Sequence, residues 1–183
     1  GVGLLRNYKK MITMSFKDIG NQVLLIGKTE GHIDQSLFAR VILDEKKGPP
    51  PEVNLFNEKN NGETLLNLIE KNYIRSAHDI SLGGILTAVS KMCIKGNKGI
   101  KLKKPKYLIS EIEYFFGEDQ GRYLIEVNPK DLKEVINILN KNSVHYDEIG
   151  TIIDKDIVIN QKTKVTIDEL RSFNTNWLKK YMA

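Results

Sequence analysis

Arg75–Gly84 reads R-S-A-H-D-I-S-L-G-G and marks a predicted change from strand to helix. Its first residues predict a short strand at 75–78. Ser81 is the predicted N-cap of a helix over 82–94, in which apolar side chains recur at intervals of three and four. Gly96 is expected to end that helix. The junction therefore predicts a chain in which strands and helices alternate, as in a sheet covered by helices.

The sequence on either side of this junction predicts the same organisation. Further strands are expected at 11–16, 22–27, 123–127, 144–153 and 157–159, the first two forming a hairpin. Further helices are expected at 36–43, 54–73, 130–141 and from 166 to about 181, with a capping box at 166–169. This order predicts an α/β (α+β) fold, a single mixed sheet flanked by helices. The β-α-β unit at 123–153 makes the fold partly ferredoxin-like.

Length and composition fit one globular domain spanning residues 1–183. Of the 183 residues, 40% are hydrophobic and 28% are charged, as in ordinary soluble proteins. No apolar run approaches the roughly 18 residues that span a bilayer, and the first ten residues lack the apolar core of a signal peptide. Cys93 is the single cysteine, so no internal disulfide forms and a reducing, cytoplasmic location is expected.

The net charge of +5 raises the alternative of a basic nucleic-acid-binding module. Lys91–Lys106 holds seven lysines and no acidic residue. Aromatic residues do not interleave with these lysines, so the stretch lacks the stacking platform of a single-strand-binding surface. A general enrichment in Lys, Asn and Ile favours compositional bias as the origin of the charge, and the role of the stretch stays open.

The 75–84 segment has the residues of a phosphate site. Backbone N–H groups in the first turn of a helix lack partners, and glycine lets them approach an anion, so Ser81, Gly83 and Gly84 are candidates for a phosphate seat. Asp79 is a candidate for orienting a metal-bound water or a ribose hydroxyl. The structural alternative is that Ser81 caps, Asp79 closes the turn, the glycines permit close packing and His78 is partly buried. Residue chemistry alone favours that alternative.

A second candidate is the turn F-F-G-E-D-Q-G-R at 115–122, in which Glu118 and Asp119 stand near Arg122 between two glycines. It is either an acidic loop that reaches into a shared site or a turn in which Arg122 pairs with an acid. The three histidines and one cysteine lack zinc-ligand spacing, and P-loop and G-x-S-x-G motifs are absent from the sequence. Without a complete catalytic set, the chain is expected to be part of an enzyme and to bind no metal itself.

Several short motifs occur together in the order of one known family. They are G-V-G-L-L at 1–5, M-I-T-M-S-F-K at 11–17, G-P-P-P at 48–51, A-H-D-I-S-L-G-G at 77–84, F-F-G-E-D-Q-G-R-Y at 115–123 and the ending N-W-L-K-K-Y-M-A. With these motifs, nearly the whole chain resembles the C-terminal domain of the phosphoribosylformylglycinamidine synthases (synthetase subunit), in the superfamily of aminoimidazole ribonucleotide synthetase. The resemblance implies that residues 1–10 enter from a preceding domain.

The resemblance implies an ATP- and Mg-dependent ligase of purine biosynthesis. In that reaction, formylglycinamide ribonucleotide is activated, as an iminophosphate, and ammonia from a glutaminase subunit displaces the phosphate. The implied partners are the preceding domains, the glutaminase subunit and a small accessory subunit. The family's catalytic and metal-binding residues lie in segments absent here, so the fragment is expected to be inactive alone; a purely structural pairing domain is the further alternative. The nucleotide- or phosphate-contacting candidates are His78, Asp79, Ser81, Gly83, Gly84, Glu118 and Arg122.

Two positions depart from the family pattern. Family members read H-D-x-S-D-G-G, whereas this chain has Leu82 where the second aspartate stands. They also have a glycine before Q-S, where this chain has Asp34. If the missing aspartate contacts a ligand, the site is weakened; if it only favours the helix start, its loss is worth on the order of 0.3–1 kcal/mol.

Overall fold

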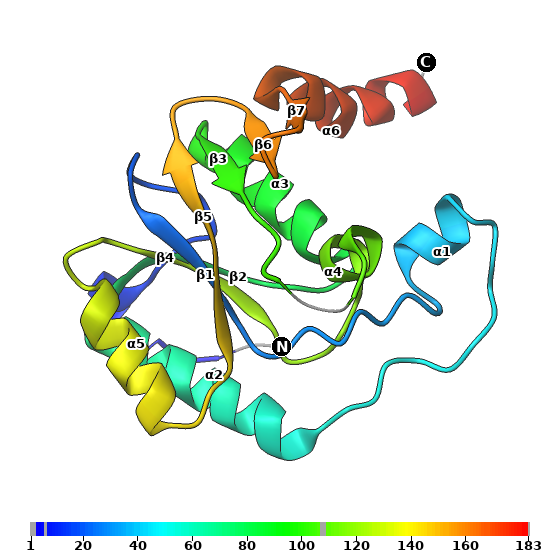
Figure 1. The fold of residues 1–183 in the computed structure, drawn as a ribbon. Helices are drawn as coiled ribbons and strands as arrows, with labels where there is room; N and C mark the ends of the chain where they lie inside the picture. The colour runs from blue at the N-terminus through cyan, green and yellow to red at the C-terminus, as the bar shows by residue number, and fades with distance from the viewer. Residues whose placement is uncertain (1–2, 6, 107–108, 183) are drawn as a thin grey trace.

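The computed structural model describes residues 3–5, 7–106 and 109–182, which build one mixed, seven-stranded sheet in the order β2-β4-β1-β5-β3-β6-β7 (Figure 1). The strands are β1 (Gln22–Ile26), β2 (Ile74–Asp79), β3 (Gly99–Leu102), β4 (Tyr123–Val127), β5 (Tyr146–Ile153), β6 (Ile157–Ile159) and β7 (Thr163–Val165). Neighbouring strands are antiparallel except β3 and β6, which pair in parallel. The predicted single mixed sheet is therefore confirmed. The segment predicted to enter from a preceding domain lies partly outside the described residues.

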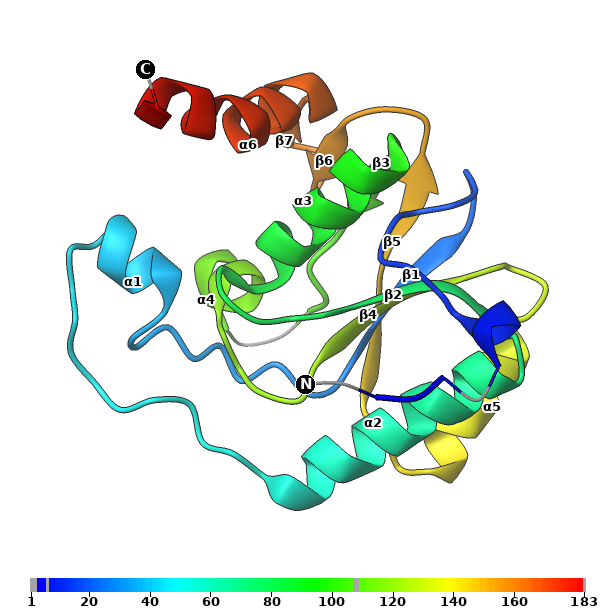
Figure 2. The ribbon, with the colours of Figure 1, turned by 180° about the vertical axis from the view of Figure 1, so that it is seen from behind.

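Helices cover both faces of this sheet (Figures 1 and 2). The helices of the structure are α1 (Leu37–Val41), α2 (Leu55–Glu70), α3 (Gly84–Gly96), α4 (Glu111–Phe116), α5 (Leu132–Lys141) and α6 (Ile167–Met182), with a short 3-10 helix at Tyr8–Lys10. Of these, α1 stands beside α4 instead of covering the sheet. β4 and β5 both pair antiparallel with β1, so they run parallel to each other with β1 between them and α5 as their connection. This split β-α-β arrangement confirms the ferredoxin-like character.

β1 is the centre of the core because both of its faces are buried. Val23 and Leu25 belong to a cluster with α3, α4 and the start of α6, whereas Leu24 and Ile26 belong to a cluster with α2 and α5. Since successive side chains of a strand point to opposite faces, the apolar run of β1 supplies both clusters. The molecule thus has two helical layers that share one central strand.

The predicted strand at 11–16 and its hairpin with 22–27 are wrong. The segment makes a single β-bridge, from Thr13 to Ser76, and β1 pairs instead with β4 and β5. The end of the segment is held by the fully buried carboxyl group of Glu126, which accepts hydrogen bonds from the backbone N–H groups of Lys17 (2.9 Å) and Asp18 (3.0 Å). Four donors in all satisfy Glu126, so side-chain chemistry fixes this segment to the sheet.

The predicted cap at Ser81 is also wrong. α3 begins at Gly84, and its N-cap is Gly83 in the left-handed region (φ 82°), without a side-chain cap. In contrast, the predicted helix at 54–73 is confirmed as α2, which starts after an Asn54 cap and runs through Gly62 to Glu70. In the described part of the chain, no helix is both long and apolar enough to cross a membrane.

Candidate functional site

The two motifs singled out in the sequence meet at the end of β2. There the N–H of Ile80 donates to the carbonyl of Arg122 (3.0 Å). The chain then turns into α3 through Gly83 and Gly84, both at positive φ. A Cβ on Gly84 would lie 2.7–2.8 Å from backbone atoms of residues 115–117, closer than real Cβ contacts allow. The two glycines therefore permit the turn and bring the acidic segment against it.

Glu118 joins this turn to a third segment. Its Oε1 accepts from the N–H of Gly83 and from the N–H of Leu37, each at 2.7 Å. Both donors stand at helix starts, where backbone N–H groups lack intrahelical partners and favour negative charge. The carboxylate of Glu118 therefore occupies the place that the sequence suggested for a phosphate, and an anion binding at Gly83 would have to displace it.

Arg122 lies beneath this junction and is 1% exposed. Its guanidinium donates to the carbonyls of Asp119 (3.0 Å) and Gly117 (2.6 Å) and to Thr29 Oγ1 (3.0 Å). Burial lowers the pKa of Arg122, and the nearby Asp119 carboxyl, 3.6 Å away, opposes that shift. With its donors turned to protein acceptors, Arg122 holds the acidic turn in shape rather than facing a ligand.

Asp119 fixes the loop that follows β1. Its two carboxyl oxygens accept from the N–H groups of Gly31 and His32, each at 3.1 Å. In return the N–H of Glu118 donates to the carbonyl of His32 (2.9 Å). The acidic turn and the loop at 28–37 are consequently held together as one unit.

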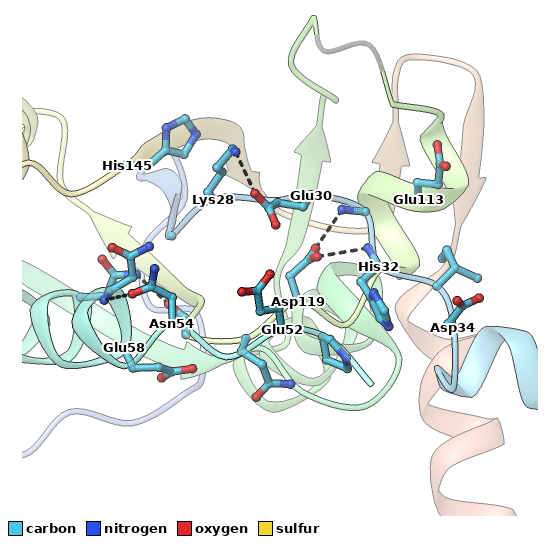
Figure 3. A pocket seen from close by; sticks show the side chains of 18 of the residues that line it. Lys28, Glu30, His32, Asp34, Glu52, Asn54, Glu58, Glu113, Asp119 and His145 are labelled. Atoms are coloured by element: carbon cyan, nitrogen blue, oxygen red, sulfur yellow. Dashed lines mark hydrogen bonds and ion pairs between the residues drawn. The ribbon is translucent and has the colours of Figure 1, made fainter. Parts of the chain in front are cut away.

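This unit forms one wall of an open cleft of about 790 Å³. The other walls come from the start of α2, the preceding segment at 51–54 and the residues before β5 (Figure 3). The lining carries six carboxyl groups and one lysine: Glu30, Asp34, Glu52, Glu58, Glu113, Asp119 and Lys28. The cleft is thus strongly acidic.

The acidic lining decides which groups the cleft suits. Lys28 pairs with Glu30 (2.8 Å), whose hydrogen bond raises the pKa of the Lys28 ammonium group. The Asp119 carboxyl is engaged by backbone N–H groups (Figure 3). Ionised carboxyl groups carry negative charge and can only accept hydrogen bonds. The cleft therefore suits cations, or ligand groups that bear N–H or O–H, better than a bare phosphate. Among the described residues, no three His, Cys, Asp or Glu side chains are grouped to hold a metal ion.

His78 and Asp79 form a separate pair. His78 Nδ1 lies 3.2 Å from Asp79 Oδ1, and the His78 side chain is 11% exposed, whereas Asp79 is exposed. Burial lowers the pKa of His78, and Asp79 opposes that effect. Within the described part of the molecule, the buried Nε2 of His78 has no hydrogen-bond partner. These contacts favour a neutral His78 imidazole, with its hydrogen on Nδ1 pointing to the Asp79 carboxylate.

The remaining predicted positions lie apart from the cleft or at its edge. Ser81 is exposed, and Leu82 is 63% exposed beside the Gly83 turn. Asp34 lines the cleft, and its carboxyl group lies where a Cβ on Gly48 would be. The sequence therefore predicted that the two motifs are important. The structure adds that they meet, through the hydrogen bond from Gly83 N–H to Glu118.

None of the seven predicted site residues lines the cleft. The sequence signals that reach its walls are the turn at 115–122, which supplies Asp119, Gln120 and Gly121, the position of Asp34, and the G-P-P-P motif at 48–51, which supplies Pro51. The chemistry-bearing residues of the cleft that the sequence interpretation missed are Lys28, Glu30, His32, Glu52, Glu58, Glu113 and His145.

Comparisons with known proteins find one protein family and its members. Residues 18–161 match the family described as AIR synthase related protein, C-terminal domain. The chain is 62% identical over 182 residues to the phosphoribosylformylglycinamidine synthase subunit PurL of Pelagibacter ubique, and 37% identical over 183 residues to that of Bartonella henselae. Each match covers the whole of this chain, whereas it covers only 25% of the length of the relative. The chain therefore spans about a quarter of the length of the curated relatives it matches.

Solved structures share the fold. Thermotoga maritima PurL complexed with FGAR superposes with a TM-score of 0.73 at 19% identity, covering 89% of this chain and 30% of that one. The complex of the same protein with ATP gives 0.69, covering 89% and 27%. Escherichia coli HypE, a hydrogenase maturation protein, gives 0.59 at 13% identity, covering 85% and 51%. At these identities the likeness concerns the fold alone.

Proposed function

The chain belongs to the AIR synthase related proteins, as their C-terminal domain, and on that basis we propose that it is the C-terminal quarter of a PurL-type phosphoribosylformylglycinamidine synthase. The observation that carries the proposal is the 62% identity to one such subunit across the whole chain. The proposed activity of the complete enzyme is the ATP-dependent conversion of formylglycinamide ribonucleotide and ammonia to formylglycinamidine ribonucleotide. The proposed setting is the cytoplasm.

The contribution of this chain is structural support and a cleft wall, not the catalytic set. Among its described residues, no three His, Cys, Asp or Glu side chains are grouped to hold a metal ion by themselves. We assign the ATP and magnesium chemistry to the rest of the enzyme because the resemblance to the synthases places the metal-binding residues in segments absent from this chain. The Glu118, Asp119 and Arg122 junction would keep the 28–37 loop in place at the wall of the cleft.

The exposed Asp79 and Ser81 remain our proposed contacts to nucleotide or phosphate from this chain, with His78, Gly83 and Gly84 supporting their turn. In the complete enzyme, Asp79→Asn with Ser81→Ala should weaken ADP binding in calorimetry while leaving the unfolding midpoint in urea nearly unchanged. Unchanged ADP affinity would leave the turn with a structural role only.

Activity measurements on the complete polypeptide test the proposed function. ADP should form only when formylglycinamide ribonucleotide and ammonium are both supplied, and the isolated chain should form none. A folded complete polypeptide without substrate-dependent ADP formation would overturn the assignment. Turnover by the isolated chain would instead show that the catalytic set lies within residues 1–183.

The basic nucleic-acid-binding alternative is disfavoured by where the lysines lie. Lys91 and Lys95 stand on α3, which covers one face of the sheet. On β3, Ile100 and Leu102 point toward α3, so Lys101 between them points to the other face. The seven lysines of the stretch therefore do not all share one face. A glutaminase subunit and a small accessory subunit are the proposed partners, and a solved Thermotoga maritima assembly is described as PurLQS.

A further inference from the structure

The first part of α6 is firmly attached to the domain. Its start carries the predicted capping box, in which Glu169 N–H donates to Thr166 Oγ1 (3.2 Å) and Thr166 N–H donates to the Glu169 carboxyl (3.1 Å). Ile167 and Leu170 pack on the core cluster around α3. The Arg171 guanidinium donates to Asn97 Oδ1 (2.7 Å) at the C-terminal end of α3. These contacts fix the direction in which the rest of the helix runs.

The second part of α6 projects past the domain (Figures 1 and 2). From Ser172 onward every side chain whose exposure is described is exposed. The large apolar residues there are Phe173 (80% exposed), Trp177 (60%), Leu178 (51%), Tyr181 (80%) and Met182 (76%). The projecting part therefore carries an aromatic surface with no covering layer in the described residues.

This surface continues the face by which α6 is attached. Ile167, Leu170, Phe173, Trp177 and Tyr181 follow one another at intervals of three and four, so they share one side of the helix. The core covers the first two of these residues, and the rest run beyond its edge. The rings of Trp177 and Tyr181 lie next to each other, with centroids 6.5 Å apart. An amphipathic face that is half covered is the pattern of a helix that bridges two bodies.

The projecting part of α6 is expected to pack against another surface, because a short helix is not stable by itself in water. A helical segment of about ten residues without tertiary packing is marginal in water, and contiguous exposed apolar surface marks interaction sites. Tryptophan and tyrosine are suited to such a contact because they bury a large apolar ring while offering one hydrogen-bond donor. The surface that packs on this part of α6 should thus be apolar and should offer hydrogen-bond acceptors to the indole N–H and the phenol O–H.

We propose that residues 172–182 dock on the remaining part of the same PurL-type polypeptide, an inference that rests on the proposed placement of this chain in a longer synthase. The relatives are about four times as long as this chain, so about three quarters of such a polypeptide is available to supply the surface. A covalently linked surface acts at millimolar effective concentration. At ordinary protein concentrations it therefore outcompetes a second copy of the chain.

Hydrogen exchange of the amides in 173–182 tests the docking, measured by mass spectrometry on the isolated chain and on the complete polypeptide. Exchange should be at least about tenfold slower in the complete polypeptide. The triple variant Phe173→Ala, Trp177→Ala and Tyr181→Ala should return the exchange to the rate of the isolated chain, although alanine favours the helix itself. The matched control Ser172→Ala with Asn176→Ala alters a pair on the other side of α6 and should retain the protection.

Equal exchange rates in the two proteins would overturn the docking, as would protection that survives the triple substitution. Protection in the isolated chain that grows with concentration, together with a doubled mass in sedimentation, would assign the surface to a second copy and also overturn it. Ligase assays on the same wild-type sample separate this inference from the proposed function. An active enzyme with an unprotected α6 contradicts only the docking, and an inactive enzyme with a protected α6 contradicts only the function.

Discussion

Arg122 shows how a single residue can hold a site without belonging to its surface. A buried guanidinium is tolerated only when its donors are satisfied, and here three backbone or hydroxyl oxygens and the Asp119 carboxyl group surround it. Removing it would take the guanidinium donors away from those buried oxygens and leave the negative charge of the Asp119 carboxyl group without its cation. The consequence reaches the cleft because Asp119 also fixes Gly31 and His32.

Arg122→Met should therefore destabilise the chain by about 3–5 kcal/mol, the range for breaking a buried ion pair from one side. Urea unfolding followed by circular dichroism measures this loss. Arg75→Met is the matched control, because Arg75 pairs with Asp18 at 3.5 Å in an exposed setting and its loss should cost about 0–1 kcal/mol. Equal losses in the two variants would contradict the structural role of Arg122.

His78 should make stability depend on pH on the acidic side. Burial lowers the pKa of His78 in the folded chain below its ordinary value of 6.5, so the unfolded chain binds more protons as the pH falls below 6.5. Stability from the neutral imidazole is therefore complete above pH 6.5 and declines below it, by at most about 1.4 kcal/mol per pH unit. His78→Gln should flatten this part of a stability-versus-pH curve from urea unfolding. A slope that persists in the variant would assign it to other groups.

Residue chemistry identified the junction because its glycines, acids and histidine are concentrated in two short motifs. It missed the cleft because the lining residues come from separate segments, such as Lys28, Glu58 and His145, whose neighbours in sequence carry no motif. It left open whether Arg122 reaches a ligand or pairs with an acid, since a sequence does not reveal that the guanidinium is buried and donates to Thr29 of the loop at 28–37. The predicted and observed sites differ because contacts between residues distant in the sequence shape the site, and residue types alone do not reveal those contacts.

At the scale of elements, strong periodicity predicted α2, α5 and the central strands well, because their apolar faces are continuous. β3 was missed since Ile100 and Leu102 are the only apolar side chains within it, and its pairing with β5 and β6 is set by distant residues. The alternation at 11–16 predicted a strand, but Phe16 packs over the end of α3, where its N–H donates to the carbonyl of Met92 (3.3 Å). Alternation indicates burial on one side and does not by itself supply a pairing partner.

Two glycines in different elements should respond to alanine in opposite directions. Gly62 lies inside α2, where a Cβ would make an ordinary van der Waals contact with Tyr123 Oη at 3.7 Å, so Gly62→Ala should stabilise the chain by about 0.5–1 kcal/mol. Gly84→Ala meets a φ of 67° and the backbone of 115–117. Backbone strain of about 1–2 kcal/mol and overpacking of about 1–3 kcal/mol should destabilise it. Thermal and urea unfolding measure both, and the same sign for both would contradict the geometry.

At the scale of the whole molecule, the two helical layers depend on one strand. β1 lies between β4 and β5, and its alternating side chains enter both core clusters. Neither layer has a sheet of its own, since β4 and β5 also present residues to both sides. The junction at the end of β2 and the cleft at the end of β1 are consequently anchored in the same sheet as the attachment of α6.

Shared use of β1 predicts one cooperative unfolding unit. Leu24→Ala faces the α2 and α5 layer and Leu25→Ala faces the α3 layer, and each fully buried leucine should cost about 2–5 kcal/mol. Because both layers rest on the same strand, each variant should accelerate hydrogen exchange of the slowest amides in α3 and in α5 by similar factors, with a single urea transition. The exposed Leu66→Ala serves as control and should leave both helices protected. If Leu25→Ala opened α3 while α5 stayed protected, the layers would be separate units that only share a strand.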